Sequence, residues 1–350
     1  MSKALCFRLD ASSLLGYGHL IQSLALADAF NKEGWVAHFV VKAYEEKVSE
    51  SISSRGYAVY DIPASLEESE DLACFSDYIK RNSCQIVVID HHDLGSRYTS
   101  SIRQQGPLVV NIDDEGTREF SCDILVNYNI YANSINYKTE SHTRMLLGPR
   151  YTILRSEFAK EPASFSSERK RLLVLMGGGY ARGEVLKVAS ALLLLPEKIL
   201  ECLHPMLILG PGYPNPETVL KEFNHPSFTW IINPKNIWEI MNDADFAICG
   251  AGGTLYELSR MGVPSITIVL DKNQKHIANA FENAGITQNL GWYENVTKGK
   301  ITRSIMQWLE KWDHVIKRRN VSLKLVDGKG TFRIVNHILT SPIAEKMVTN

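Results

Sequence analysis

The sequence has no long hydrophobic run and no excess of charge of either sign. Its longest apolar stretches, such as Ala191–Leu195, are far too short to span a bilayer. The N-terminus lacks the apolar segment and the small-residue cleavage site of a signal peptide. The formal net charge of -1 offers no basic surface to nucleic acid or to anionic membranes. We therefore expect a cytoplasmic protein with no stable membrane insertion and no nucleic-acid partner.

Cysteine is scarce and is not arranged for metal binding. The six cysteines lie at positions 6, 74, 84, 122, 202 and 249, without the paired spacing of a zinc site. Several of them fall within apolar runs that predict strands. We therefore expect buried, reduced thiols rather than disulfides or metal ligands.

What the sequence has instead is an alternation of strand and helix patterns. Apolar runs separated by about 20 to 30 residues of helical pattern predict βαβ units around a parallel sheet. In the first half, the predicted strands are Ala4–Leu9, Trp35–Val41, Ala58–Ile62, Gln85–Asp90 and Leu108–Ile112. After a polar, linker-like segment at residues 160–170, the pattern restarts with Leu172–Met176, Met206–Leu209, Phe228–Ile232, Phe246–Cys249 and Ile266–Leu270.

The 350 residues are therefore expected to form two domains, which is also the natural expectation for this length. The predicted fold class is α/β, with two Rossmann-like, doubly wound domains that face each other across a cleft. We expect an N-terminal domain at residues 1–160, a C-terminal domain at residues 161–330, and a tail at residues 331–350 that packs back on the first domain. Ligands of such domains bind at the carboxyl ends of the strands.

A glycine-rich turn follows the first predicted strand and ends at a histidine. Gly16 and Gly18 let the backbone approach a ligand closely, and the helix that starts after His19 favours anionic groups at its N-terminus. With an unperturbed pKa of about 6.5, His19 could exchange protons near neutral pH. The same residues are also compatible with a plain helix start that carries a surface histidine.

Acidic and histidine residues end the next predicted strands of the first half. Asp90, His91 and His92 end one strand, and the acidic run 113–115 follows the next. Because the carboxyl ends of parallel strands share one edge of the sheet, we expect these side chains near His19. This edge is where an active site would be assembled.

A second glycine-rich turn, at residues 250–254, lies between a predicted strand and a predicted helix. The backbone amides of Gly252 and Gly253 and the hydroxyl of Thr254 could bind a phosphate there. The spacing matches neither the dinucleotide fingerprint nor a Walker A loop. Glu257 could accept ribose hydroxyls, or it could complete a Thr-x-x-Glu capping box.

Asn273 and Gln274 follow the next predicted strand of the second half. Their amides could bind sugar hydroxyls or N-acetyl carbonyls. Alternatively, Asn273 could cap the helix that follows, which is a common use of asparagine.

Taken together, these motifs resemble those of a known enzyme family. They lie, in order, at Arg8–His19, Val88–His91, Ile112–Glu115, Cys122–Asn129, Gly148–Phe158, Met176–Gly178, Ala251–Glu257 and Asn273–Gln274. The chain resembles the UDP-2,4-diacetamido-2,4,6-trideoxy-β-L-altropyranose hydrolases of pseudaminic acid biosynthesis, a nonulosonic acid pathway. The resemblance covers most of the chain, and its specificity lies in the order and spacing of the motifs.

The resemblance implies a fold of the glycosyltransferase B type, with UDP held mainly by the C-terminal domain and the sugar in the cleft. Water would attack the anomeric carbon, the glycosyl C–O bond would break, and UDP would leave without a metal or another cofactor. His19 is the implied base, and Asp10, Asp90 and His92 would orient the water or contact the sugar. The expected substrate-binding residues are Gly16, Gly18, Gly178, Gly252, Gly253, Thr254, Glu257, Asn273 and Gln274.

Three positions depart from the family pattern. Gln22 stands where family members usually carry arginine, His92 where they usually carry tyrosine, and Tyr180 where they usually carry aspartate. These changes keep open an alternative: a glycosyltransferase of the same fold that uses a sugar or a lipid-linked acceptor. A third hypothesis is a nucleotide-sugar binding protein without catalysis. The sequence carries no signal of the oligomeric state.

Overall fold

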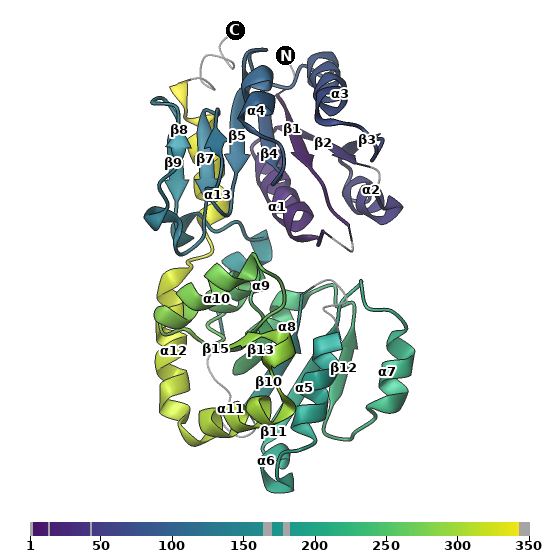
Figure 1. Cartoon of the computed structure of the whole chain (residues 1–350), viewed down its shortest axis with the longest axis vertical. Coiled ribbons are helices and arrows are strands. Elements are labelled where there is room, and N and C mark those ends of the chain that lie inside the picture. The colour runs from purple at the N-terminus through teal and green to yellow at the C-terminus, as the bar shows by residue number, and fades with distance from the viewer. Residues whose placement is uncertain (1–2, 13–14, 43, 164–169, 178–182, 343–350) are drawn as a thin grey trace. The chain divides into compact units, whose positions relative to one another are not determined.

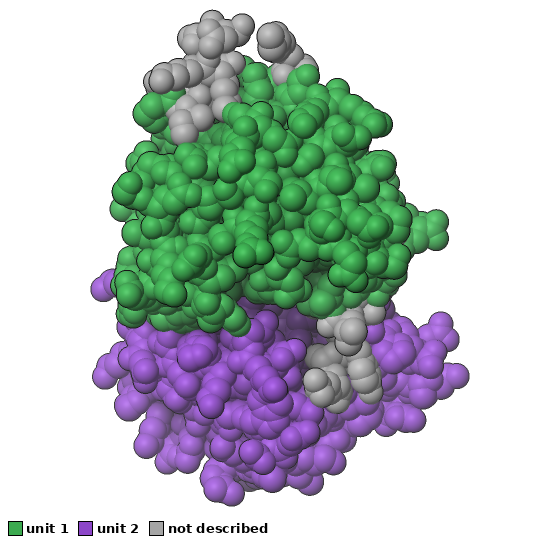
Figure 2. Space-filling model, turned by 45° about the horizontal axis from the view of Figure 1, so that its top comes forward, with its two compact units in different colours: residues 1–156, 329–350 green, residues 157–328 purple. Residues whose placement is uncertain are grey.

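The structure is a computed structural model that describes residues 3–12, 15–42, 44–163, 170–177 and 183–342 (Figure 1). The chain divides into two compact units, which Figure 2 colours separately. Unit 1 comprises residues 1–156 and 329–350, and unit 2 comprises residues 157–328. Each unit is built on one large parallel sheet flanked by helices. The prediction of two doubly wound α/β domains is confirmed.

The sheet of unit 1 has seven strands in the order β3-β2-β1-β4-β5-β7-β9, and all the pairs are parallel. The strands are β1 Ala4–Leu9, β2 Val36–Lys42, β3 Ala58–Ile62, β4 Ile86–Asp90, β5 Leu108–Ile112, β7 Ile124–Asn127 and β9 Arg144–Leu147. The helices are α1 Gly18–Lys32, α2 Glu46–Ser53, α3 Glu68–Arg81, α4 Ser96–Arg103 and α13 Gly330–Leu339. Two short strands, β6 Glu119–Phe120 and β8 Lys138–Thr139, pair separately.

Strand β1 shows why a mostly apolar run becomes a central strand. Alternate side chains of a strand point to opposite faces of the sheet. Leu5, Phe7 and Leu9 join the core that α1 and α13 cover, whereas Ala4 and Cys6 join the core that α3 and α4 cover. A strand buried on both faces has no solvent side, so its side chains are apolar except for Arg8, whose buried guanidinium pairs with Asp10 and Asp71.

The sheet of unit 2 has six parallel strands in the order β12-β11-β10-β13-β14-β15. The strands are β10 Lys170–Leu175, β11 Leu203–Leu209, β12 Thr229–Ile232, β13 Phe246–Gly250, β14 Ser265–Val269 and β15 Thr287–Trp292. The helices are α5 Glu184–Leu192, α6 Glu197–Glu201, α7 Pro216–Glu222, α8 Ile237–Asp243, α9 Thr254–Arg260, α10 Gln274–Asn283, α11 Lys298–Glu310 and α12 Trp312–Leu325. Its core contains only residues of unit 2.

Helix α13 belongs to unit 1 although it follows unit 2 in the chain. Its apolar face, with Ile334, Val335 and Ile338, packs in the same core as α1. At its first turn, the hydroxyl of Thr331 accepts the N–H of Leu154 at 2.9 Å and donates to the Leu154 carbonyl at 2.7 Å. Unit 1 is therefore assembled from two separate segments of the chain.

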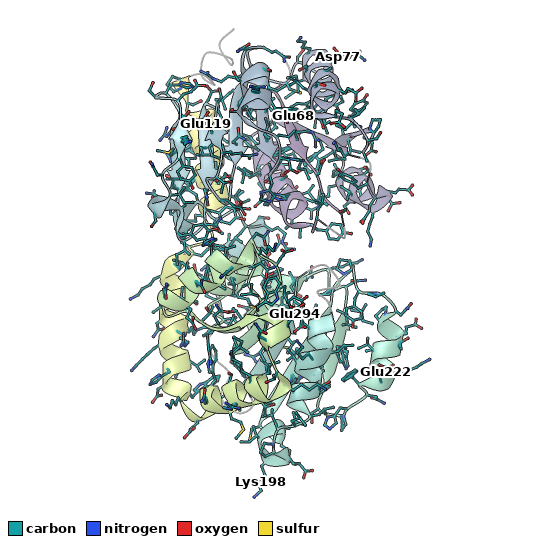
Figure 3. All side chains as sticks on the ribbon, in the orientation of Figure 1. Glu68, Asp77, Glu119, Lys198, Glu222 and Glu294 are labelled. Carbon is teal, nitrogen blue, oxygen red and sulfur yellow. The ribbon has the colours of Figure 1, made fainter. Side chains whose placement is uncertain are left out.

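The outer faces of the helices carry charged side chains, among them Glu68, Asp77, Lys198 and Glu222, which lie exposed (Figure 3). Within the described residues, no helix combines the length and the apolar character that a membrane crossing requires. The six cysteines are unpaired, and Cys202 is exposed, so the expectation of buried thiols is wrong for that residue.

Candidate active site

The predicted site residues that the structure describes lie at or after the ends of β1 and β4 in unit 1, and after the ends of β13 and β14 in unit 2. The order in which successive strands are added to the sheet reverses between β1 and β4 in unit 1, and between β10 and β13 in unit 2. Open parallel sheets bind ligands outside the carboxyl ends of strands at such a point. The loop that leads to His19 follows β1, Asp90 is the last residue of β4, and Gly250 is the last residue of β13.

The turn before His19 depends on a glycine. Gly16 has a φ of +89°, a backbone conformation that other residues rarely adopt. Its N–H donates to the carbonyl of Ser12 at 2.8 Å, which closes the turn. Helix α1 then begins at Gly18, so His19 lies in its first turn. The turn thereby directs the chain from the end of β1 into a helix whose second residue is the histidine.

His19 and Asp90 form a hydrogen-bonded ion pair at this edge. The Nδ1 atom of His19 lies 2.6 Å from Oδ1 of Asp90, whose side chain is only 1% exposed. Burial alone would lower the pKa of His19, but the charge and hydrogen bond of Asp90 outweigh it and raise the pKa to about 9. A carboxylate in this position holds one imidazole tautomer and stabilises the imidazolium form.

The other oxygen of Asp90 is occupied by neighbours on α1. Gln22 Nε2 donates to Asp90 Oδ2 at 2.6 Å, and Ser23 Oγ donates to the same oxygen at 3.3 Å. Tyr128, which follows β7, donates its hydroxyl to Gln22 Oε1 at 2.8 Å. The tyrosine thereby orients the Gln22 amide so that its NH₂ group faces the carboxylate.

His92 completes the group from the loop after β4. Its Nε2 lies 3.0 Å from the Nε2 of His19, and the two rings meet edge to face, with centroids 4.7 Å apart. Arg118 holds this loop through three carbonyl oxygens, those of His91 at 2.7 Å, His92 at 2.6 Å and Leu94 at 2.8 Å. The exposed His92 ring is thus carried on an anchored backbone.

Asp10 reaches the same edge, but its oxygens are engaged by the protein itself. Oδ1 accepts from Arg8 Nη1 at 2.6 Å and from the Lys42 N–H at 2.9 Å, and Oδ2 lies 2.9 Å from His91 Nε2. Burial would raise the pKa of Asp10, but the hydrogen bond from His91 and the Arg8 charge outweigh it and lower the pKa to about 2. The carboxylate stays ionised and holds the loop of His91. Its geometry favours a positioning role.

In unit 2, the turn after β13 brings together Gly252, Gly253 and Thr254. A Cβ on Gly250 would lie 2.8 Å from a methyl carbon of Leu270, so the start of the turn has no room for a side chain. A Cβ on Gly253 would meet nothing within 4 Å. Helix α9 begins at Thr254 with Gly253 as its cap residue, so Thr254 is not the capping residue of a Thr-x-x-Glu box. The Glu257 side chain is half-buried on the same helix.

The amide of Gln274 is oriented towards the same turn. Its Oε1 accepts the N–H of Leu270 at 3.0 Å, and its Nε2 lies 3.7 Å from the position that a Cβ on Gly252 would take. Asn273 precedes α10 and is exposed, and its side chain makes no capping hydrogen bond. Gly178, together with the departure at Tyr180, lies outside the described residues.

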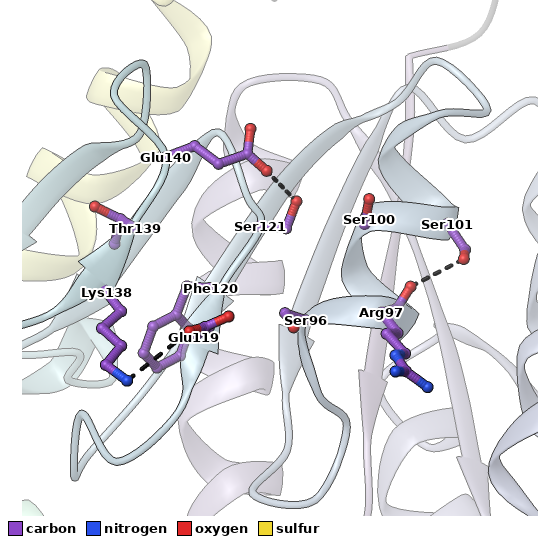
Figure 4. A pocket seen from close by; sticks show the side chains of 10 residues that line it. All are labelled: Ser96, Arg97, Ser100, Ser101, Glu119, Phe120, Ser121, Lys138, Thr139 and Glu140. Atoms are coloured by element: carbon purple, nitrogen blue, oxygen red, sulfur yellow. Dashed lines mark hydrogen bonds and ion pairs between the residues drawn. The ribbon is translucent and has the colours of Figure 1, made fainter.

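A hollow of about 730 Å³ lies in unit 1 between α4 and the β6–β8 pair (Figure 4). Its lining includes the paired side chains Ser121 and Glu140, and Lys138 with Glu119. None of the residues predicted from the motifs lines it. We therefore place the candidate chemistry at the His19–Asp90 pair.

Sequence reasoning missed three residues of this arrangement as contributors. The sequence marks Gln22 only as a departure from the family pattern. Because Gln22 lies three residues after His19 in a predicted helix, the two side chains share a helical face. Tyr128 carries a partial signal, because it lies in the family motif Cys122–Asn129, but the strand β7 that it follows was not predicted. Arg118 lies in a loop and has no local signal, so only the folded chain shows that it holds the loop of His92.

Comparisons with known proteins agree with this architecture. Residues 175–314 match the glycosyltransferase family 28 C-terminal domain. A crystal structure of Acinetobacter baumannii MurG matches with a TM-score of 0.72 at 14% identity, covering 97% of this chain and 100% of that one. The chain therefore has a fold of the glycosyltransferase B type.

Two relatives of this chain are named as hydrolases. The UDP-2,4-diacetamido-2,4,6-trideoxy-β-L-altropyranose hydrolase of Campylobacter jejuni is 25% identical over 284 residues, which cover 80% of this chain and 96% of that protein. The pseudaminic acid cytidylyltransferase and UDP-2,4-diacetamido-2,4,6-trideoxy-β-L-altropyranose hydrolase of Helicobacter pylori is 22% identical over 269 residues, covering 70% of this chain and 48% of that protein. The resemblance predicted from the motifs is confirmed.

Proposed function

We propose that the chain is a metal-independent hydrolase of a UDP-2,4-diacetamido-2,4,6-trideoxyhexose that releases UDP and the free sugar in pseudaminic acid biosynthesis. The observation that carries this proposal is the His19–Asp90 pair, with Nδ1 and Oδ1 2.6 Å apart at the carboxyl edge of the sheet. The name of the Campylobacter jejuni relative supports the substrate class.

In this reaction His19, paired with Asp90, activates water, and unit 2 binds the UDP moiety. A general base must be within hydrogen-bond reach of the proton it takes and be held in one tautomer, as Asp90 holds His19. We assign the diphosphate to the amides of Gly252 and Gly253 and to the Thr254 hydroxyl. Donors at a helix start stabilise the charge that develops on a leaving phosphate. We assign the ribose hydroxyls to Glu257.

The test is a release assay without any acceptor and with EDTA present. We expect phosphorus and proton NMR to show UDP and free sugar forming from a UDP-2,4-diacetamido-trideoxyhexose within a panel of UDP-amino sugars. In ¹⁸O-enriched water, attack at the anomeric carbon leaves UDP unlabelled, whereas attack at the β-phosphorus places the label in UDP. Release from no member of the panel, or label in UDP, would contradict the proposal.

A substitution identifies the histidine in the same assay. We expect His19→Asn to lower turnover by about 100-fold or more while UDP affinity stays within a few-fold, because general acid–base catalysis typically contributes that factor. His204→Asn is the matched control, since His204 is an exposed histidine in unit 2 that contacts Thr229. Turnover of His19→Asn above a tenth of the wild-type value would count against His19.

A glycosyltransferase is the second candidate. It is favoured by the match of residues 175–314 to a glycosyltransferase family 28 domain and by the unusual Gln22 and His92. A transferase would bind UDP but release sugar only when a sugar or lipid-linked acceptor is supplied. Binding of UDP without release, with or without such acceptors, would favour a binding protein instead.

A further inference from the structure

Five side chains of unit 1 form one continuous line of hydrogen bonds. Tyr128 donates to Gln22 at 2.8 Å, Gln22 donates to Asp90 at 2.6 Å, Asp90 contacts His19 at 2.6 Å, and His19 contacts His92 at 3.0 Å. The line begins at a half-buried phenol and ends at an exposed imidazole. It passes through a carboxylate that is 1% exposed.

The direction of each hydrogen bond follows from its partners. The Tyr128 hydroxyl donates to the amide oxygen, so the amide nitrogen of Gln22 must donate to Asp90. An ionised carboxylate only accepts, so the Nδ1 of His19 carries a proton. Only the Nε2 of His19 then remains to change its protonation state, and that atom faces the Nε2 of His92.

Two nitrogens 3.0 Å apart share a single proton when they are hydrogen-bonded. When the pair holds one extra proton, His19 is the imidazolium and donates to His92. When that proton is lost, both rings are neutral. His92 then carries its proton on Nε2 and donates it to His19, so the Nδ1 of His92 has no proton and can accept one. Among the described residues, nothing forms a hydrogen bond to His92 Nδ1, and the ring is exposed.

We propose that His92 is the proton acceptor of the hydrolysis and His19 is a relay behind it, an inference that rests on the hydrolase function proposed above. The O–H bond of the attacking water breaks as an Nδ1–H bond forms on His92. The Nε2–H bond of His92 breaks as an Nε2–H bond forms on His19. The water oxygen bonds to the anomeric carbon, and UDP leaves with the electron pair of the glycosyl C–O bond.

The charges around the pair favour this direction of transfer. The relay moves the positive charge from exposed His92 to His19, which contacts Asp90 and is also stabilised by the charges of Asp114 and Asp10. Attraction between opposite charges is strongest where water is excluded, as it is at Asp90.

The hydrogen bond between the two rings can be detected without any substrate. In the whole protein labelled with ¹⁵N-histidine, we expect a scalar coupling between the Nε2 nuclei of His19 and His92. His92→Asn should remove it, and the control His204→Asn should leave it unchanged. Absence of the coupling on both sides of the titration would overturn the relay.

The kinetic test separates proton transfer from a merely structural role. We expect His92→Ala to lower kcat by about 100-fold or more with KM changed by less than about threefold, because the loss falls on the proton-transfer step. Free imidazole should restore part of the kcat of His92→Ala. It should not restore His19→Ala, because His92 still occupies the position that accepts the proton of the water.

The outcomes distinguish the two proposals. If the wild-type protein releases sugar but His92→Ala keeps its kcat and its pH dependence, the relay is overturned and the hydrolase stands. If the wild-type protein releases no sugar from any UDP-amino sugar, the hydrolase function is overturned. The proton relay is then overturned as well, even where the coupling between the two Nε2 nuclei is observed.

Discussion

Asp90 is the residue on which the candidate site depends. It is 1% exposed, and its two oxygens serve different partners, His19 on one side and Gln22 with Ser23 on the other. A neutral amide satisfies the second oxygen without offsetting the negative charge. The full charge of Asp90 therefore acts on His19, and this explains why the pKa of His19 rises although burial opposes it.

The pH dependence of the reaction follows from this charge. The working base is the pair His19–His92 after it has lost its extra proton. The kcat/KM of the wild-type protein should therefore rise with pH and level off above the His19 pKa of about 9. Gln22→Arg places a cation against Asp90 and should shift this limb down by about one pH unit or more. The measurement is the pH profile of kcat/KM, taken from initial rates of UDP release.

The control for that substitution is Gln104→Arg, which adds the same charge at an exposed glutamine after α4. It should leave the limb in place. An unmoved limb in Gln22→Arg would show that Asp90 does not set the pKa of His19.

At the scale of elements, the arrangement depends on two connections that hold loops and helices in place. Arg118 ties the loop of His92 to the segment before β6 through three carbonyls. Thr331 ties the first turn of α13 to the backbone of Leu154 in both directions. Gly330 lies so close to the Thr152 backbone that a Cβ has no room there. The helix therefore docks at a defined position.

We expect Thr331→Val to destabilise unit 1 by about 2 to 4 kcal/mol, because it keeps the shape but leaves a buried N–H and a buried carbonyl without a partner. Denaturant unfolding followed by circular dichroism measures the change in the free energy of unfolding. Thr340→Val, at an exposed threonine at the opposite end of the same helix, is the control and should cost less than about 0.5 kcal/mol. Equal effects of the two substitutions would show that the Leu154 contacts do not stabilise α13.

At the scale of the whole molecule, each unit has its own core. The apolar cluster described in unit 2 contains only residues of unit 2. The two clusters described in unit 1 contain only residues of unit 1. Unit 2 is one continuous segment, whereas unit 1 needs α13 from the end of the chain. A segment of about 170 residues is long enough to bury a core of its own.

The fragment 157–328 should therefore fold alone, with a cooperative thermal transition, and should bind UDP by calorimetry without releasing sugar. The fragment 1–156 is the matched comparison. It lacks α13 and leaves the Ile334 side of its core uncovered, so it should aggregate or unfold without cooperativity. A fragment 157–328 without a cooperative transition would contradict the independence of the two cores.

Local patterns in the sequence determined most of the architecture. Apolar runs such as Ala4–Leu9 and Phe246–Cys249 became central parallel strands, because a strand covered on both faces is apolar along most of its length. The one charged residue of the first run, Arg8, is buried only because it is paired with carboxylates. The same patterns placed Asp90 and His92 at a strand end, and the carboxyl ends of parallel strands meet at one edge.

Only the tertiary structure decided which side chains contact one another at that edge. His19 and Asp90 are 71 residues apart, and Tyr128 reaches Gln22 across 106 residues. The Arg8–Asp71 pair and the place of α13 beside α1 depend in the same way on strand order and helix packing. Spacing along the chain reports local geometry alone, whereas these contacts are set by how the sheet brings distant segments together.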